Sequence, residues 1–166
     1  MSYRSLFPVA VLVSALAAPL AAQAPDSVTF RGTGGIISQS VAIPAGRALL
    51  ITSGMLGPVV DSTAPAGTRG RYGDTKTQGI GIMKTLQKAL ADAGLTMKDV
   101  VSLRVFIAGD ATKGGQFDFP GWNEAYGQFF NNPTNPTKPT RYVVGVAWLA
   151  RPEALLEIDA TAVYPK

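Results

Sequence analysis

Arg141 is the residue best placed to do chemistry. It follows the segment 133–139, which has three prolines in seven residues and reaches Thr140-Arg141 without any possibility of helix. A guanidinium is permanently charged and binds a carboxylate through two parallel hydrogen bonds. We therefore expect Arg141 to anchor a small molecule that carries a carboxylate. The alternative is a structural ion pair with Glu157 or Asp159.

The composition excludes several classes of enzyme. The sequence contains neither histidine nor cysteine. Histidine is the commonest general base, the two residue types together supply most zinc ligands, and the cysteine thiolate is a frequent nucleophile. The sequence therefore argues against metal hydrolases and against cysteine or Ser-His-Asp enzymes. With no disulfide available, stability must come from packing.

The charge of the chain is too low for a nucleic-acid-binding surface. There are 15 Lys and Arg against 11 Asp and Glu, a net charge of +4. The densest basic cluster is Arg69-Gly70-Arg71, which is too short for a phosphate-binding stripe. We expect no nucleic-acid partner.

The N-terminus has the pattern of a secretory signal peptide. Arg4 precedes an apolar run over 6–18, and Ala22-Gln23-Ala24 forms an A-x-A cleavage site. The run has about 13 residues, fewer than the ~20 that span a bilayer. We expect residues 1–24 to be cleaved and 25–166 to form a single domain, periplasmic or secreted, without membrane contact. A tether that escapes cleavage is the alternative.

Hydrophobic periodicity predicts an α+β domain with a mixed sheet and two helices on one face. Thr75 and Gln78 look like a capping box for the first helix, and Gly79 and Gly81 in its first turns indicate close packing. A long loop is expected over 57–73. The predicted strands are 41–43, 47–53, 99–108, 141–148 and 155–163, with helices over 75–93 and 117–130 and the last two strands joined as a hairpin at 150–153.

The predicted hairpin has one apolar and one mixed face. Tyr142, Val144, Val146 and Trp148 are expected under the helices, whereas Arg141 and Val143 would share the other face with Phe106, Arg104, Glu157 and Asp159. That face is too apolar for solvent and too charged for a core, so a second copy should cover it. In this hairpin Arg141 and Glu157 lie about 16 Å apart along the strand. They would meet only across a subunit interface.

Several short segments, in this order, together resemble one known family. They are Leu50–Gly54, Gln78, Ala93–Leu95, Asp99–Ile107, Asn123–Tyr126, Phe129-Phe130, Pro139–Arg141 and Leu156–Ala160. The chain resembles the Rid, or YjgF-type, reactive-intermediate deaminases over about residues 47–163. The resemblance implies a chorismate-mutase-like fold and a homotrimer with clefts between subunits.

The resemblance also implies a site and a reaction. Arg141 would bind the substrate carboxylate and Glu157 would help to position water, while Ser53, Gly54, Asn123 and Val143 would line the cleft. The implied reaction hydrolyses small 2-imino or enamine acids to 2-keto acids and ammonia, with no metal and no cofactor. Non-catalytic binding of a small carboxylate, or a chaperone-like role, is the alternative. RNA cleavage, also attached to the family by name, ranks last because there is no histidine.

Three positions depart from the family pattern. Ile37 stands where many active members have a tyrosine, Met55 replaces a glutamine, and Val143 takes a cysteine-like position. Each change removes a hydrogen-bonding group from the expected cleft. The sequence therefore predicts the carboxylate anchor in a pocket that is more apolar than usual.

Overall fold

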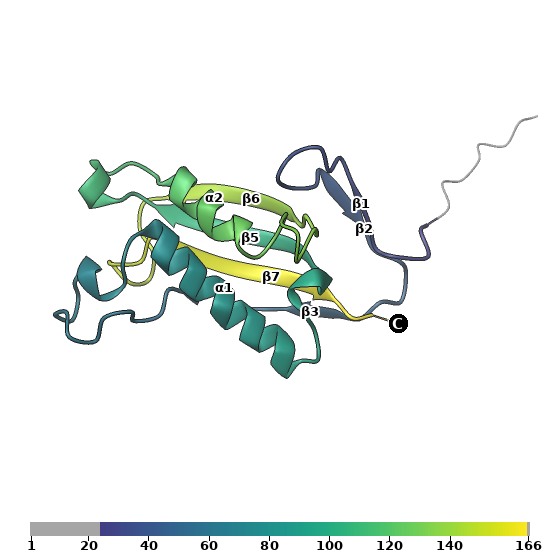
Figure 1. Ribbon diagram of the computed structural model, residues 1–166, viewed down its shortest axis with the longest axis horizontal. Coiled ribbons are helices and arrows are strands. Elements are labelled where there is room, and N and C mark those ends of the chain that lie inside the picture. Colours follow the sequence, from purple (N-terminus) through teal and green to yellow (C-terminus); the bar gives the residue numbers. More distant parts are fainter. Residues whose placement is uncertain (1–23, 166) are drawn as a thin grey trace, which may run out of the picture.

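The computed structural model describes residues 24–165, so the predicted signal peptide lies almost entirely outside the described residues. Its body is a five-stranded mixed sheet in the order β3-β7-β5-β6, with β4 also paired to β7. Both helices cover one face of this sheet, as predicted (Figure 1). The strands are β1 Thr29–Arg31, β2 Ser40–Ala42, β3 Leu49–Ile51, β4 Met55–Leu56, β5 Val100–Ala108, β6 Thr140–Val146 and β7 Leu156–Val163, and the helices are α1 Thr75–Asp92 and α2 Phe119–Gly127.

Three short 3-10 turns and a small hairpin complete the fold. The turns are Arg69–Arg71, Met97–Asp99 and Ala111–Lys113. Strands β1 and β2 pair antiparallel in a separate two-stranded sheet, which stands beside the main sheet near the C-terminal end of the chain (Figure 1). The predicted strand at 41–43 thus belongs to this hairpin and not to the main sheet.

The predicted hairpin between the last two strands is wrong. Strand β5 lies between them: β6 pairs with β5 in parallel and β7 pairs with β5 antiparallel. Because α2 lies between β5 and β6, these elements form a β-α-β crossover, which makes the two strands parallel. The connection over 147–155 then carries the chain past the end of β5 to its other side.

This topology also reverses the predicted faces of β6. Side chains of directly paired residues point to the same face of a sheet, and Arg141 is paired with Leu103 and Val143 with Val105. Leu103 and Val105 are fully buried under the helices. Arg141 and Val143 therefore lie on the helix face. The predicted faces of β5 and β7 are confirmed.

The opposite face of β6 carries the larger apolar side chains. Tyr142 and Val144 are 48% and 43% exposed. Strand β6 lies at the edge of the sheet, where the helix layer only partly covers it, so a charged residue can occupy the inner side. The apolar outer side chains are left without cover in one chain.

The N-cap of helix α1 is Asp74, one residue before the Thr75 that the capping-box pattern suggested. Asp74 caps it by accepting a hydrogen bond from the Thr77 amide at 2.8 Å. Gln78 is instead fully buried, and its side chain donates to the Glu153 carbonyl and accepts from the Leu155 amide, both at 2.9 Å. The glutamine therefore ties α1 to the start of β7.

The two helix glycines mark close packing, as predicted. A Cβ at Gly79 would come within 2.9 Å of the Ala125 Cβ of α2, and one at Gly81 within 2.6 Å of the Pro58 ring. Hydrogen at these positions lets α1 lie directly on α2 and on the 57–73 loop. This contact fixes the position of α2 over β6.

Candidate functional site

Arg141 lies beneath α2 on a platform of two buried aromatic rings. Its NH2 group donates to the Asn123 Oδ1 at 2.9 Å. Its Cζ lies 4.5 Å from the centre of the Tyr126 ring and 5.6 Å from that of Trp122. Stacking on aromatic faces stabilises and orients a guanidinium. The side chain is therefore held in one position before any ligand arrives.

Two nitrogens of this guanidinium have no partner among residues 24–165. The Nε and NH1 atoms of Arg141 are buried and make no hydrogen bond there, and none of the ion pairs among these residues includes Arg141. Burial lowers the pKa of Arg141, and the nearby Tyr126 phenol partly opposes that shift. An arginine still remains charged at any ordinary pH. A buried charge of this kind is costly unless an anion comes to it.

Tyr126 supports the site without titrating. Its hydroxyl donates to the Ile36 carbonyl at 3.1 Å. Burial raises the pKa of Tyr126 to about 12, against the opposing effect of the Arg141 charge. The phenol is therefore neutral at physiological pH. Trp122 and Tyr126 are buried residues of the core, and their contact with Arg141 could not be read from their spacing in the sequence.

The chain segment before β2 runs along the start of β6. Ser38 forms a parallel bridge with Thr140, and its hydroxyl donates to the Lys138 carbonyl at 2.5 Å. Ile37, which stands where a tyrosine was expected, is half-buried and packs on the core. This segment brings an apolar side chain close to the first residues of β6.

Glu157 belongs to a second group on the other face of the sheet. It lies between Leu156 and Ile158, which both point into the core, so its own side chain points outward. There its carboxylate lies against the backbone of Gly54, where any Cβ would collide with it. Ser53 is exposed beside Gly54. Arg104 pairs with Asp159 at 2.5 Å, and no ion pair of Glu157 is found within 24–165.

The predicted site residues therefore form two separate groups in one chain. Arg141, Asn123 and Val143 lie on the helix face, while Glu157, Gly54 and Ser53 lie on the opposite face. Arg141 aligns with Ala160 through Leu103, three residues from Glu157. Two strand spacings across and three residues along correspond to roughly 14 Å between the Cα atoms of Arg141 and Glu157.

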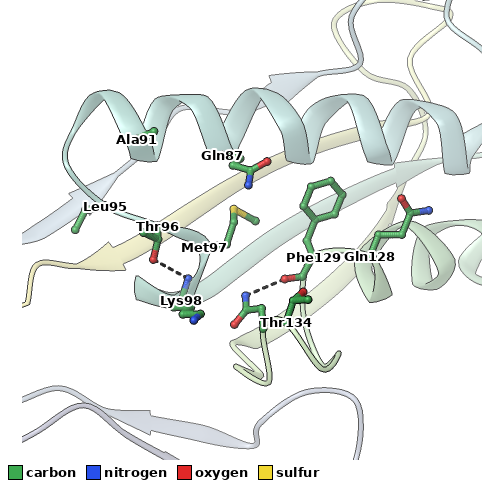
Figure 2. A pocket seen from close by; sticks show the side chains of 10 residues that line it. Gln87, Ala91, Leu95, Thr96, Met97, Lys98, Gln128, Phe129 and Thr134 are labelled. Carbon is green, nitrogen blue, oxygen red and sulfur yellow. Dashed lines mark hydrogen bonds between the residues drawn. The ribbon is translucent and has the colours of Figure 1, made fainter.

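Two cavities of the described part of the chain lie elsewhere. One of about 320 Å³ is bounded by the C-terminal part of α1, the turn over 95–98 and the segment over 128–135 that follows α2 (Figure 2). Its polar groups are largely engaged: the Lys98 amide donates to Thr96, and the Asn135 side chain donates to the Phe129 carbonyl. A second, of about 310 Å³, lies between the segment before β1 and the sheet. Neither contains a predicted site residue.

Within residues 24–165 there is no cluster of three potential metal ligands. In the same part of the chain, no helix combines the length and the apolar character needed to cross a membrane.

Known proteins are similar to this chain in sequence. The family model described as Endoribonuclease L-PSP matches residues 38–164. The chain belongs to this family, which is also called YjgF or Rid. A curated relative, the 3-aminoacrylate deaminase RutC of Acinetobacter baylyi, is 32% identical over 90 residues. That match covers 54% of this chain and 63% of RutC, so it spans less than two thirds of the relative.

Solved Rid-family structures have the same fold. Escherichia coli TdcF with bound serine is 32% identical, covers 74% of this chain and 85% of its own, and gives a TM-score of 0.55. YyfB of Yersinia pestis, described as a protein of the conserved Rid family, is 26% identical. The match covers 77% of this chain and 86% of YyfB, with a TM-score of 0.57. The expected mixed sheet with two helices on one face is thus confirmed as the fold of this family.

Proposed function

We propose that this Rid protein hydrolyses 2-imino acids, and their enamine tautomers, to 2-keto acids and ammonia in a cleft between subunits of a homotrimer. The observation that carries the proposal is the buried Arg141 guanidinium, held by Asn123 and two aromatic rings with two N–H groups left free. A substrate carboxylate supplies two acceptor oxygens and the missing negative charge.

The reaction needs only water and correctly placed polar groups. With the carboxylate fixed on Arg141, water attacks the adjacent C=N carbon, and the resulting carbinolamine breaks its C–N bond to release ammonia and leave the 2-keto acid. Glu157 can orient that water and accept its proton, which then passes to the leaving nitrogen. Neither a metal nor a cofactor takes part in these steps.

A second copy of the chain would bring the two groups together. Arg141 and Glu157 face opposite sides of one sheet, so one molecule of substrate cannot touch both in a single chain. The outer face of the sheet also exposes apolar side chains, including Tyr142, Val144 and Ile51, the last of them 63% exposed. A trimer that covers this face would place the Glu157 group of one subunit near the Arg141 group of its neighbour.

The relatives support the same class of ligand. RutC is named for a deaminase reaction on 3-aminoacrylate, an enamine acid, and TdcF is described with serine bound. Both compounds are small and carry one carboxylate and one nitrogen, which lies on the adjacent carbon in serine and one carbon further away in 3-aminoacrylate. The name endoribonuclease points instead to RNA, but nothing in the site around Arg141 favours that reaction.

A non-catalytic role is the second candidate. Ile37, Met55 and Val143 place apolar groups where the family pattern has hydrogen-bonding ones. A cleft that keeps its arginine and loses such groups could bind a small carboxylate without turning it over. Export through the predicted signal peptide is part of either proposal.

The deciding experiment measures hydrolysis of an imine made in situ. An L-amino-acid oxidase generates the 2-imino acid, semicarbazide traps what is not hydrolysed, and ammonia is followed in parallel. We expect the protein to accelerate ammonia release and suppress trapping, and Arg141→Ala to abolish both effects. Arg31→Ala, at an exposed arginine in β1, is the matched control. Without any acceleration over the oxidase alone the deaminase proposal fails, and Arg141-dependent binding of 2-ketobutyrate would then establish the binding role.

A further inference from the structure

We propose that Phe117 and Phe119 form the wall that receives the substrate side chain, so that this protein prefers 2-imino acids with a large apolar side chain. This inference rests on the proposed deaminase function and names the substrate class of the same site. It rests on the positions of two aromatic side chains that are exposed and do not belong to the buried core.

Phe119 lies about one helical turn from Asn123, the residue that accepts the hydrogen bond from Arg141. It is the first residue of α2, and Asn123, which accepts the hydrogen bond from Arg141, follows four residues later. Residues four apart lie on the same face of a helix with Cβ atoms about 5–6 Å apart. Both side chains are exposed, so Phe119 borders the side of α2 from which Asn123 reaches Arg141.

Phe117 lies over the same row of β6 that carries Arg141. A Cβ at Gly145 would come within 2.6 Å of the Phe117 ring, so the ring rests directly on this glycine. Gly145 is paired with Ile107, which is fully buried on the helix face. The inner row of β6 thus runs from Arg141 through Val143 to the Phe117 ring.

The two rings form one surface. Their centres are 6.0 Å apart, and the rings meet edge to face at 61°. Phe117 is 42% exposed and Phe119 is 41% exposed. Apolar side chains left exposed together, beside a buried and unpaired charge, are typical of a ligand site.

The connection that carries Phe117 is held at several points. The Asp110 amide donates to the Gln116 carbonyl at 2.9 Å, which closes the loop before Phe117. Asp118 caps α2 by accepting from the Gly121 amide, and it pairs with Lys113 at 2.7 Å. The rings are therefore positioned by a fixed loop, which limits the entropy lost when a ligand packs against them.

The geometry matches an amino-acid skeleton. The carboxylate lies at Arg141, and the row of β6 that starts there reaches Gly145, under the Phe117 ring, four residues or about 13 Å further along the strand. A leucine or phenylalanine side chain that extends along this row from the carboxylate would approach the two rings. The group between them is Val143, which is half-buried and apolar. A methyl side chain would leave this wall without contact.

The test compares imines made from alanine, leucine and phenylalanine. We expect kcat/KM for the leucine and phenylalanine imines to exceed that for the alanine imine by about 10-fold or more, since each added apolar group in a pocket contributes measurable discrimination. Phe117→Ala should reduce this ratio about 10-fold with little effect on the alanine imine. Phe117→Leu keeps an apolar wall and should keep most of the preference.

A second variant tests the wall without removing either ring. Gly145→Ala adds one methyl group that must push the exposed Phe117 ring aside. We expect the preference for large substrates to change while the alanine imine is still hydrolysed. An equal loss on all three imines in these variants would overturn the specificity role.

The rates on the three imines distinguish loss of the aromatic wall from loss of the deaminase activity. Arg141-dependent hydrolysis of all three imines at similar kcat/KM would keep the deaminase and overturn the aromatic wall. If no imine is hydrolysed, titration with pyruvate and phenylpyruvate decides. Tighter binding of phenylpyruvate that is lost in Phe117→Ala would support the wall in a binding protein, and equal or absent binding would overturn it.

Discussion

Arg141 and Glu157 lie on opposite faces of the same sheet. Arg141 points toward α2, where it bonds to Asn123, and Glu157 points outward against Gly54. Strand β5 lies between their two strands. A substrate that touches both groups therefore needs two copies of the chain.

Mixed oligomers should recover activity from two inactive variants. Arg141→Ala removes the anchor, and Glu157→Gln removes the proton acceptor, so each homo-oligomer should be inactive. In randomly mixed trimers with sites between subunits, about one quarter of the sites combine an intact Arg141 from one chain with an intact Glu157 from its neighbour. We expect about that fraction of the parental activity after co-refolding, measured by ammonia release.

The same mixture provides its own control. Refolding each variant alone under identical conditions should give no activity, and light scattering reports the mass of every sample. Recovery near zero in a mixture of confirmed trimers would show that Arg141 and Glu157 do not act in one site. A monomeric mass for the parent protein would contradict the cleft between subunits.

Gly79→Ala should destabilise the protein although alanine is the better helix former. The new methyl group would lie 2.9 Å from the Ala125 Cβ and 3.2 Å from Leu156 Cδ1, inside a packed core. Overpacking costs typically 1–3 kcal/mol, against a propensity gain of up to ~1 kcal/mol, so we expect a net loss of about 1–2 kcal/mol. Urea unfolding measures the difference.

Gly127→Ala is the matched control for that substitution. Gly127 is the last residue of α2, is exposed, and has no atom within 4 Å of its Cβ position. Alanine there should leave stability unchanged or raise it by up to ~1 kcal/mol. Equal effects at both glycines would show that the contact between the helices is not tight.

Asp110 should make stability depend on pH in acid. Burial alone would raise its pKa, but hydrogen bonds from Thr112 and the charge of Arg69, 3.1 Å away, lower it below the ordinary value of 3.8. A carboxyl whose pKa is depressed by folding contributes stability above its unfolded pKa and loses it as pH falls through the folded value. This contribution should be complete above about pH 5 and be lost progressively as pH falls through 4 toward the folded pKa.

The measurement compares the parent protein with Asp110→Asn across pH. The variant should be less stable by about 1–3 kcal/mol at neutral pH, because it loses an ion pair and strong hydrogen bonds. Below pH 4 the two unfolding free energies should converge. A difference that stays constant down to pH 2 would contradict the lowered pKa of Asp110.

The N-terminal prediction can be tested by mass. When the full chain is produced in a bacterium, we expect the mature protein to begin at Pro25 and to be found outside the cytoplasm. Ala24→Arg should block cleavage after the A-x-A site and leave residues 1–24 attached. An intact chain recovered from the cytoplasm would contradict export.

Local sequence patterns were sufficient for the two helices and the central strands, and they singled out Arg141 as a candidate. The apolar spacing of α1 and β5 and the rigid proline approach to Arg141 are properties of contiguous residues. They therefore predicted which segments fold and which faces of β5 and β7 are buried, while anion binding by Arg141 stays a prediction.

Only the tertiary structure decided where those residues lie relative to each other. A short connection at 150–153 favoured a hairpin, yet β5 inserts between β6 and β7 because a strand that follows a helix crossover pairs in parallel. That pairing puts Arg141 on the helix face against Tyr126, and puts Phe117 over Gly145 in the same row. Such contacts depend on long-range pairing, which no periodicity within a single strand records.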